Sequence, residues 1–108
     1  MTTRPGKLLV YGANGYTGTL AAELCRDRGL APILAGRNGD TIAALAQRLG
    51  FEHRVFGLDD AVALDAGLAD VAVVLHCAGP FSRTAQPMVD ACLRTGTHYM
   101  DVTGEFAV

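Results

Sequence analysis

The sequence predicts an α/β fold: a three-layer, doubly wound parallel sheet of five strands with helices on both faces. Three observations support it. Short apolar runs alternate with amphipathic stretches along all 108 residues. The run at 71–77 is almost continuously apolar, as in a strand buried on both faces. A glycine-rich segment at 12–18 lies between the first apolar run and the first helical stretch, which gives the order strand, turn, helix.

The spacing of apolar residues sets each element. Strands are expected at 8–11, 32–35, 53–56, 71–77 and 98–102, and helices at 16–28, 41–49, 61–68 and 85–95. Right-handed crossovers between parallel strands give the spatial order 3-2-1-4-5. No linker or repeat divides the chain, so residues 1–108 are expected to form one domain.

Caps and apolar faces refine the helices. Asp40 and Thr84 are expected to be N-caps, with Pro87 in the first turn after Thr84. Gly29, Gly50 and Gly96 are expected to end their helices, and a stop is expected near Gly67. The expected buried faces are Leu20, Ala21, Leu24 and Cys25 in the first helix, Ile42, Leu45, Ala46 and Leu49 in the second, and Met88, Val89, Cys92 and Leu93 in the last.

Composition excludes several classes of function. The net charge of −2 leaves no basic excess for a nucleic-acid partner. No apolar run is long enough to span a bilayer. Three cysteines without a close pair indicate reduced thiols in a cytoplasmic protein. The cysteines and histidines lack a metal-binding spacing such as Cys-x-x-Cys, so no metal site is expected.

The expected ligand site lies beyond the carboxyl ends of the strands, where strand order reverses. The residues there are 12–15, 36–38, 58–60 and 77–80. Gly12 can form a tight turn, Gly15 lets backbone N–H groups approach phosphate, and Gly18 lets the helix pack closely. The helix N-terminus adds unpaired donors and partial positive charge. The segment therefore predicts binding of a dinucleotide pyrophosphate.

The end of the second strand indicates which dinucleotide. Sheets that bind NAD usually carry Asp or Glu here, but this chain has Arg37, 19 residues after Gly18, and no carboxylate before Asp40. A guanidinium can pair with a 2′-phosphate and stack on adenine. We therefore expect a preference for NADP(H). The alternative is that Arg37 is a solvated loop arginine.

Two further turns admit two interpretations each. Asp59 could meet the adenine edge, or it could cap the following helix. Cys77 and the small residues Ala78, Gly79 and Pro80 could let the cofactor lie flat against the backbone, or they could form a plain turn. His76 is expected to be a hydrogen-bonded core residue and not a catalytic base.

Several motifs together resemble one family. The segments are YGANGYTG (11–18), LAGRN (34–38), CAGPF (77–81), VDAC (89–92) and GTHYMDVTGE (96–105). They resemble the N-terminal, Rossmann-like NADP-binding domain of saccharopine dehydrogenase-like proteins, a group that includes trans-acting enoyl reductases. The resemblance implies phosphate contacts from Gly12, Asn14, Gly15, Tyr16, Thr17 and Gly18, and a 2′-phosphate contact from Arg37. The full candidate cofactor-binding set is Gly12, Ala13, Asn14, Gly15, Tyr16, Thr17, Gly18, Gly36, Arg37, Asn38, Asp59, Cys77, Ala78, Gly79 and Pro80.

The resemblance implies an NADP(H)-dependent oxidoreductase whose second domain holds the substrate cavity and often a homodimer contact. Family members have several hundred residues, so the chain is expected to be an isolated or truncated domain without the substrate domain. It would bind cofactor and lack turnover alone. The alternative is a non-catalytic, NADP(H)-sensing binding module. A methyltransferase-like nucleotide site would require an acid where Arg37 stands.

No catalytic residue is assigned. Tyr99, Asp101 and Glu105 lie on or beyond the fifth strand, near the expected nicotinamide end. They could act as general acids, or they could pack against the second domain.

Overall fold

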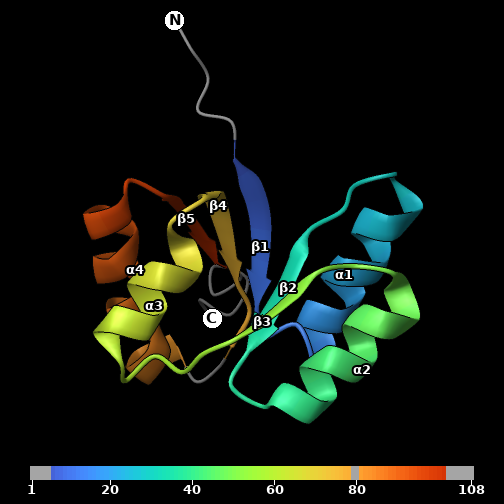
Figure 1. Ribbon diagram of the computed structural model, residues 1–108, viewed down its shortest axis with the longest axis horizontal. Coiled ribbons are helices and arrows are strands. Elements are labelled where there is room, and N and C mark those ends of the chain that lie inside the picture. The colour runs from blue at the N-terminus through green and yellow to red at the C-terminus, as the bar shows by residue number, and fades with distance from the viewer. Residues whose placement is uncertain (1–5, 79–80, 102–108) are drawn as a thin grey trace, which may run out of the picture.

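The computed structural model describes residues 6–78 and 81–101. Within them the elements are β1 (Lys7–Tyr11), α1 (Tyr16–Asp27), β2 (Ile33–Gly36), α2 (Gly39–Leu49), β3 (His53–Val55), α3 (Ala61–Leu68), β4 (Val71–His76), α4 (Phe81–Thr95) and β5 (His98–Asp101). All neighbouring strands pair in parallel, in the order β3-β2-β1-β4-β5. Helices α1 and α2 cover one face of the sheet, and α3 and α4 cover the other (Figure 1). The predicted fold class and strand order are confirmed.

Two apolar layers form the core because side chains alternate across the pleated strands. Leu9, Ile33 and Val74 face α3 and α4, where they pack against residues such as Met88. Val10 and Leu34 point to the opposite face, where α1 and α2 supply Ala22, Ile42, Leu45, Ala46 and Leu49. The sheet interior is therefore buried on both sides, as the apolar strands predict.

Helix α1 packs through smaller residues than its apolar pattern predicts. Its buried residues are Gly18 and Ala22, whereas Leu20 and Leu24 are 50% and 55% exposed. The expected buried face was therefore wrong for these leucines. Small residues let the helix approach the first strand closely, and this approach rotates the larger side chains outward.

Two predicted caps were also wrong. The N-cap of α2 is Asn38, whose Oδ1 accepts from the Thr41 backbone N–H, so Asp40 lies inside the first turn. Helix α4 already begins at Phe81, so Thr84 and Pro87 both lie within it. In α4, Met88 and Cys92 are buried as expected, whereas Leu93 is 77% exposed and Ala91 is buried in its place.

The other expected ends agree with the structure to within one or two residues. Gly50 ends α2 with a φ of +78°, and Gly96 follows α4 with a φ of +73°. Helix α3 ends at Leu68, one residue after Gly67, and spans the predicted range 61–68. Two predicted strands, at 53–56 and 71–77, end one residue earlier in the structure, and residue 102 of the strand predicted at 98–102 lies outside the described residues.

A charged cluster lies at the amino-terminal end of the sheet. Arg54 on β3 donates to both carboxylate oxygens of Asp70, at 2.6 and 2.9 Å, and to Glu52 and the Gly67 carbonyl. Lys7 pairs with Glu52 at 3.3 Å and with Asp70 at 3.7 Å. The hydrogen bond from Arg54 lowers the pKa of Asp70 to about 2. This cluster joins β1 and β3 to the start of β4, far from the carboxyl ends of the strands.

Candidate cofactor site

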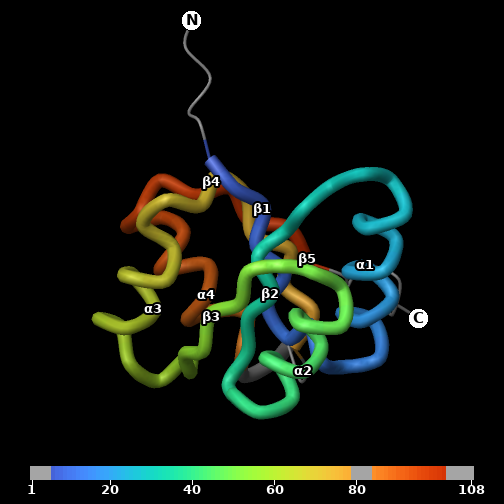
Figure 2. Tube along the Cα trace, turned by 45° about the vertical axis from the view of Figure 1, so that its right-hand side comes forward, coloured from blue at the N-terminus to red at the C-terminus, as the bar shows by residue number. Residues whose placement is uncertain are grey.

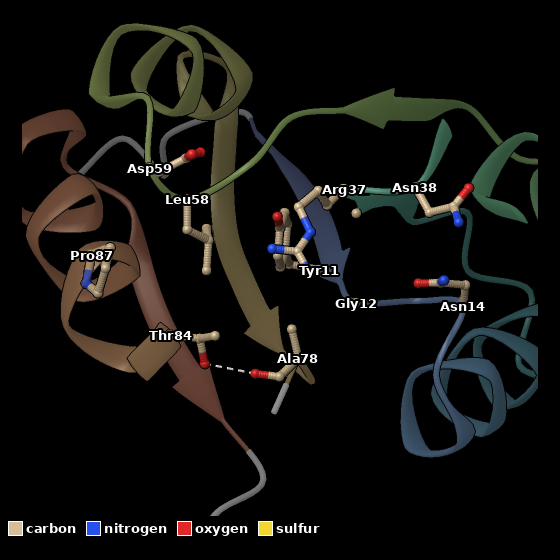
Figure 3. A pocket seen from close by; sticks show the side chains of 11 residues that line it. Tyr11, Gly12, Asn14, Arg37, Asn38, Leu58, Asp59, Ala78, Thr84 and Pro87 are labelled. Atoms are coloured by element: carbon tan, nitrogen blue, oxygen red, sulfur yellow. Dashed lines mark hydrogen bonds between the residues drawn. The ribbon is translucent and has the colours of Figure 1, made fainter. Parts of the chain in front are cut away.

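A cleft of about 500 Å³ opens at the carboxyl ends of the strands. Its lining residues are Tyr11, Gly12, Asn14, Gly36, Arg37, Asn38, Leu58, Asp59, Ala78, Thr84 and Pro87. Figure 3 shows Arg37, Asn38, Gly12 and Asn14 on one side, and Thr84 and Pro87 on the other. In Figures 1 and 2 the loops that follow β1 and β2 lie together at the end of the sheet opposite the N-terminus. The cleft is at the predicted switch point and within the size range of small-molecule sites.

Glycines shape the base of the cleft. Gly12 has a φ of +78°, and a Cβ on it would lie 2.7 Å from the Ala78 backbone nitrogen. A Cβ on Gly18 would overlap the Gly12 carbonyl oxygen and lie 2.7 Å from Ala13 Cα. Gly12 therefore makes the tight turn, and Gly18 permits the close packing of α1, as predicted from the sequence.

The N-terminus of α1 has no side-chain cap. Its N-cap is Gly15, whereas α2 is capped by Asn38 and α3 by Asp60. No acidic residue lies in the first turn of α1. The first-turn N–H groups and the partial positive charge of the helix therefore remain available to a phosphate. Tyr16 begins this turn and is 83% exposed.

A hydrogen-bonded chain joins the glycine loop to the loop after β2. Asn14 Nδ2 donates to Thr41 Oγ1 at 2.9 Å, and Thr41 Oγ1 donates to the Asn38 carbonyl at 3.2 Å. Gly36 lies beneath this chain, where a Cβ would come within 2.8 Å of Ile42 Cδ1 and 3.3 Å of Asn14 Oδ1. The loop that carries Arg37 is thereby held against the glycine loop.

Arg37 is exposed on the rim of the cleft. Within residues 6–78 and 81–101 it forms no ion pair, whereas Arg48, Arg54 and Arg94 each bind a carboxylate. The end of β2 carries no acid beside it. A cation without a carboxylate partner suits a 2′-phosphate, and the glycine turn with its uncapped helix suits a pyrophosphate. The residues present fit NADP(H).

Tyr11 anchors the part of the cleft that is lined by Leu58 and Asp59. Its hydroxyl donates to the Phe56 carbonyl at 2.7 Å, and burial raises its pKa to about 12. This bond ties the segment that leads to Leu58 and Asp59 to the end of β1. Asp60, and not Asp59, caps α3, because its Oδ1 accepts from the N–H groups of residues 62 and 63. The carboxylate of Asp59 is left facing the cleft (Figure 3).

His76 and Thr84 support the turn after β4. His76 is fully buried, and its Nε2 lies 2.9 Å from Thr84 Oγ1, which donates to the Ala78 carbonyl at 2.7 Å. Burial lowers the pKa of His76 to about 4, so its ring is neutral at neutral pH. His76 is therefore a hydrogen-bonded core residue, as expected.

Only part of the predicted cofactor-binding set lines the cleft. Seven predicted residues line it: Gly12, Asn14, Gly36, Arg37, Asn38, Asp59 and Ala78. Ala13, Gly15, Tyr16, Thr17, Gly18 and Cys77 lie beside it without lining it, and Gly79 and Pro80 lie outside the described residues. Leu58, which lies in the expected segment 58–60, also lines the cleft. Sequence reasoning missed Tyr11, Thr84 and Pro87 as lining residues. Tyr11 directly precedes the expected segment 12–15, so extending that segment by one residue would have found it.

Two further candidates from the sequence, Tyr99 and Asp101, do not line this cleft. Tyr99 donates to Asp101 Oδ2 at 2.7 Å, and Glu105 lies outside the described residues. Among residues 6–78 and 81–101, no cluster of three histidine, cysteine or acidic side chains could hold a metal ion. In the same part of the chain, no helix combines the length and apolar character needed to cross a bilayer.

Comparison with known proteins agrees with this geometry. The chain is 39% identical over 105 residues to the trans-acting enoyl reductase of Mycobacterium leprae, which covers 91% of this chain and 25% of that protein. Its identity to the trans-acting enoyl reductase of Mycobacterium tuberculosis (strain ATCC 25618 / H37Rv) is 36%, with the same shares covered. The chain thus spans about a quarter of the length of these relatives.

Solved structures show the same fold. Apo saccharopine dehydrogenase (L-Glu forming) from Saccharomyces cerevisiae superposes with a TM-score of 0.77 and 26% identity, over 89% of this chain and 21% of that one. The Citrobacter triphenylmethane reductase complexed with NADP(H) gives a TM-score of 0.75 over 88% of this chain and 36% of that one; its 23% identity shows the fold alone. The saccharopine dehydrogenase NADP-binding domain family matches residues 8–107, nearly the whole chain. The chain belongs to this family, and its cofactor is NADP.

Proposed function

We propose that the chain forms the cofactor site of an NADP(H)-dependent oxidoreductase, and that the cleft described above holds the adenosine half and the pyrophosphate. The bound cofactor supplies or accepts a hydride. Gly12 and the first turn of α1 bind the pyrophosphate, Arg37 binds the 2′-phosphate, and Asn14 keeps the two loops together. The observation that carries the proposal is an exposed arginine at the end of β2 that pairs with no carboxylate within residues 6–78 and 81–101.

The substrate is proposed to bind in a part of the protein outside these 108 residues. The relatives that are 39% and 36% identical are enoyl reductases, so an enoyl group is the first substrate to test. In such a reduction, hydride and a proton add across the carbon–carbon double bond while NADPH becomes NADP⁺. We also propose a cytoplasmic location, which the three free thiols support, and a homodimer contact outside these residues.

Titration of the chain with NADPH and NADH tests the cofactor site. The expected result is tighter binding of NADPH by about tenfold or more, because only NADPH can engage Arg37. Equal affinities, or tighter binding of NADH, would contradict the proposal. The gene product that contains these residues should then oxidise NADPH in the presence of an enoyl thioester. Cofactor binding without any turnover on enoyl substrates would contradict the enoyl assignment.

A further inference from the structure

Ala78, two residues after the end of β4, accepts a hydrogen bond from a side chain of helix α4. Thr84 lines the cleft, and its hydroxyl points toward Ala78 across the cleft's lower part (Figure 3). Its Oγ1 donates to the Ala78 carbonyl at 2.7 Å and lies 2.9 Å from Nε2 of the fully buried His76. One hydroxyl therefore joins a core side chain to a backbone carbonyl at the edge of the site.

The Thr84 hydroxyl donates to the Ala78 carbonyl, which can only accept. An imidazole with a proton on Nε2 would donate to the same hydroxyl oxygen. The Nε2–H tautomer of His76 therefore matches both contacts, and the buried ring would then help to position the Thr84 oxygen.

Ala78 packs directly against the neighbouring glycine loop. The Ala78 backbone nitrogen lies 2.7 Å from where a Cβ on Gly12 would be, and its Cα lies 2.8 Å from the same point. The turns after β1 and β4 thus touch backbone to backbone. If the Ala78 carbonyl lost the Thr84 hydroxyl, its negative end would be free to turn toward the phosphates of the cofactor.

We propose that Thr84, oriented by His76, is a positioning residue that sets affinity for the whole dinucleotide by fixing the contact between Ala78 and Gly12. It acts on NADPH and NADH alike, in contrast to Arg37, which distinguishes them. This inference rests on the proposed binding of the cofactor in the same cleft.

Three variants test the role. Thr84→Val keeps the shape and removes the hydroxyl, Thr84→Ser keeps the hydroxyl, and Thr95→Val is the matched control. The Thr95 hydroxyl also donates to a backbone carbonyl of α4, that of Ala91, but Thr95 does not line the cleft. We expect Thr84→Val to weaken NADPH and NADH by about tenfold each, with Thr84→Ser and Thr95→Val within about threefold of the unmodified chain.

The titrations separate the two proposals. Loss of NADPH affinity in Arg37→Ala, together with unchanged affinities in Thr84→Val, would overturn the role of Thr84 alone. Failure of the unmodified chain to bind NADPH would overturn the proposed function. A loss in Thr84→Val confined to NADPH, or no recovery in Thr84→Ser, would also overturn the positioning role.

A second measurement does not depend on any variant folding. Long-range proton–nitrogen NMR of the unmodified chain reports which imidazole nitrogen carries the proton. We expect His76 to be the Nε2–H tautomer at neutral pH. The Nδ1–H tautomer or an imidazolium would overturn the assignment, because neither the hydrogen-bond directions nor the support of Thr84 would then hold.

Discussion

Gly12 and Ala78 bring the turns after β1 and β4 into direct backbone contact. A Cβ on Gly12 would lie 2.7 Å from the nitrogen and 2.8 Å from the Cα of Ala78. The two strands are neighbours at the point where strand order reverses, so this contact forms the floor of the cleft. The Ala78 methyl group is the one side-chain atom at this contact, since Gly12 has none.

Gly12→Ala should destabilise the chain for two reasons, a positive φ and an overlap with Ala78. Gly29→Ala is a matched control, because Gly29 has a φ of +76° with nothing within 4 Å of its Cβ position. We expect Gly29→Ala to lower the free energy of unfolding by about 1–2 kcal/mol, because alanine is strained at a positive φ. Gly12→Ala should lower it by about 1–3 kcal/mol more, because the added Cβ also overlaps Ala78. Chemical denaturation measures both. Equal losses of unfolding free energy in the two variants would show that Ala78 can move to accommodate a Cβ on Gly12 at little cost.

Gly15→Ala should separate folding from binding. A Cβ at Gly15 would meet only the Gly12 carbonyl oxygen, at 3.4 Å, so the cofactor-free chain has room for it. We expect a change in the free energy of unfolding of about 1 kcal/mol or less, with weaker binding of both NADPH and NADH because the phosphate can no longer approach the backbone. Unchanged affinity for both cofactors would remove Gly15 from the phosphate site.

Arg37→Ala should weaken NADPH binding by about 1.5–3 kcal/mol, since a charge-assisted contact with the 2′-phosphate is lost. NADH binding should change little. Arg28→Ala removes the same charge from the exposed end of α1, away from the cleft, and serves as the control. Isothermal titration with both cofactors gives the comparison. Equal losses for NADPH and NADH in Arg37→Ala would rule out 2′-phosphate recognition by this residue.

The buried His76 should make stability depend on pH. Its pKa is lowered from the usual 6.5 to about 4, so the unfolded chain binds the proton first as pH falls. The contribution of neutral His76 to the free energy of unfolding should be fully present above pH 6.5 and be lost as the pH falls from 6.5 to about 4. His76→Gln should flatten this decline, whereas His53→Gln, at an exposed position, should keep it. Denaturation at several pH values tests this; parallel curves for His76→Gln and the unmodified chain would contradict it.

The charged cluster at the other end of the sheet should respond to stronger acid. Asp70 is stabilised as a carboxylate by Arg54, and its folded pKa is about 2, below the usual 3.8. Its contribution is therefore present above pH 3.8 and lost as pH falls to about 2. Asp70→Asn should lower stability at neutral pH, and the difference should shrink across this interval. Asp27→Asn, at a more exposed pair, should have a smaller effect. A constant difference down to pH 2 would be inconsistent with the Arg54 contact.

Apolar periodicity was enough to predict the order of the elements and the pairing of the strands. It could not predict the rotation of α1, because Gly18 and Ala22 contribute little to an apolar pattern and yet set how closely the helix approaches β1. The cap at Asn38 was missed because Asp40 is an equally good capping residue two positions later. Which of the two residues caps the helix depends on where the preceding strand ends, and this is set by strand pairing in the folded sheet.

Site residues could be predicted from the sequence where a single local motif places them. Gly12 and Arg37 follow from local spacing, and the structure places both at the cleft. Thr84 and Pro87 could not be found in this way, since they reach the cleft only because α4 begins at Phe81 and packs beside the turn after β4. Their presence in the cleft depends on how α4 packs against the sheet, and this packing cannot be predicted from a local sequence motif.

The exposure of Arg37 also has a consequence for the rate of cofactor capture. The chain carries a net charge of −2, so a polyanionic cofactor approaches a molecule of like overall sign. The accessible Arg37 guanidinium on the rim offers a local attraction that salt screens over about 8 Å at physiological ionic strength. Association should therefore slow as ionic strength rises, while dissociation, governed by contacts within the cleft, stays nearly constant.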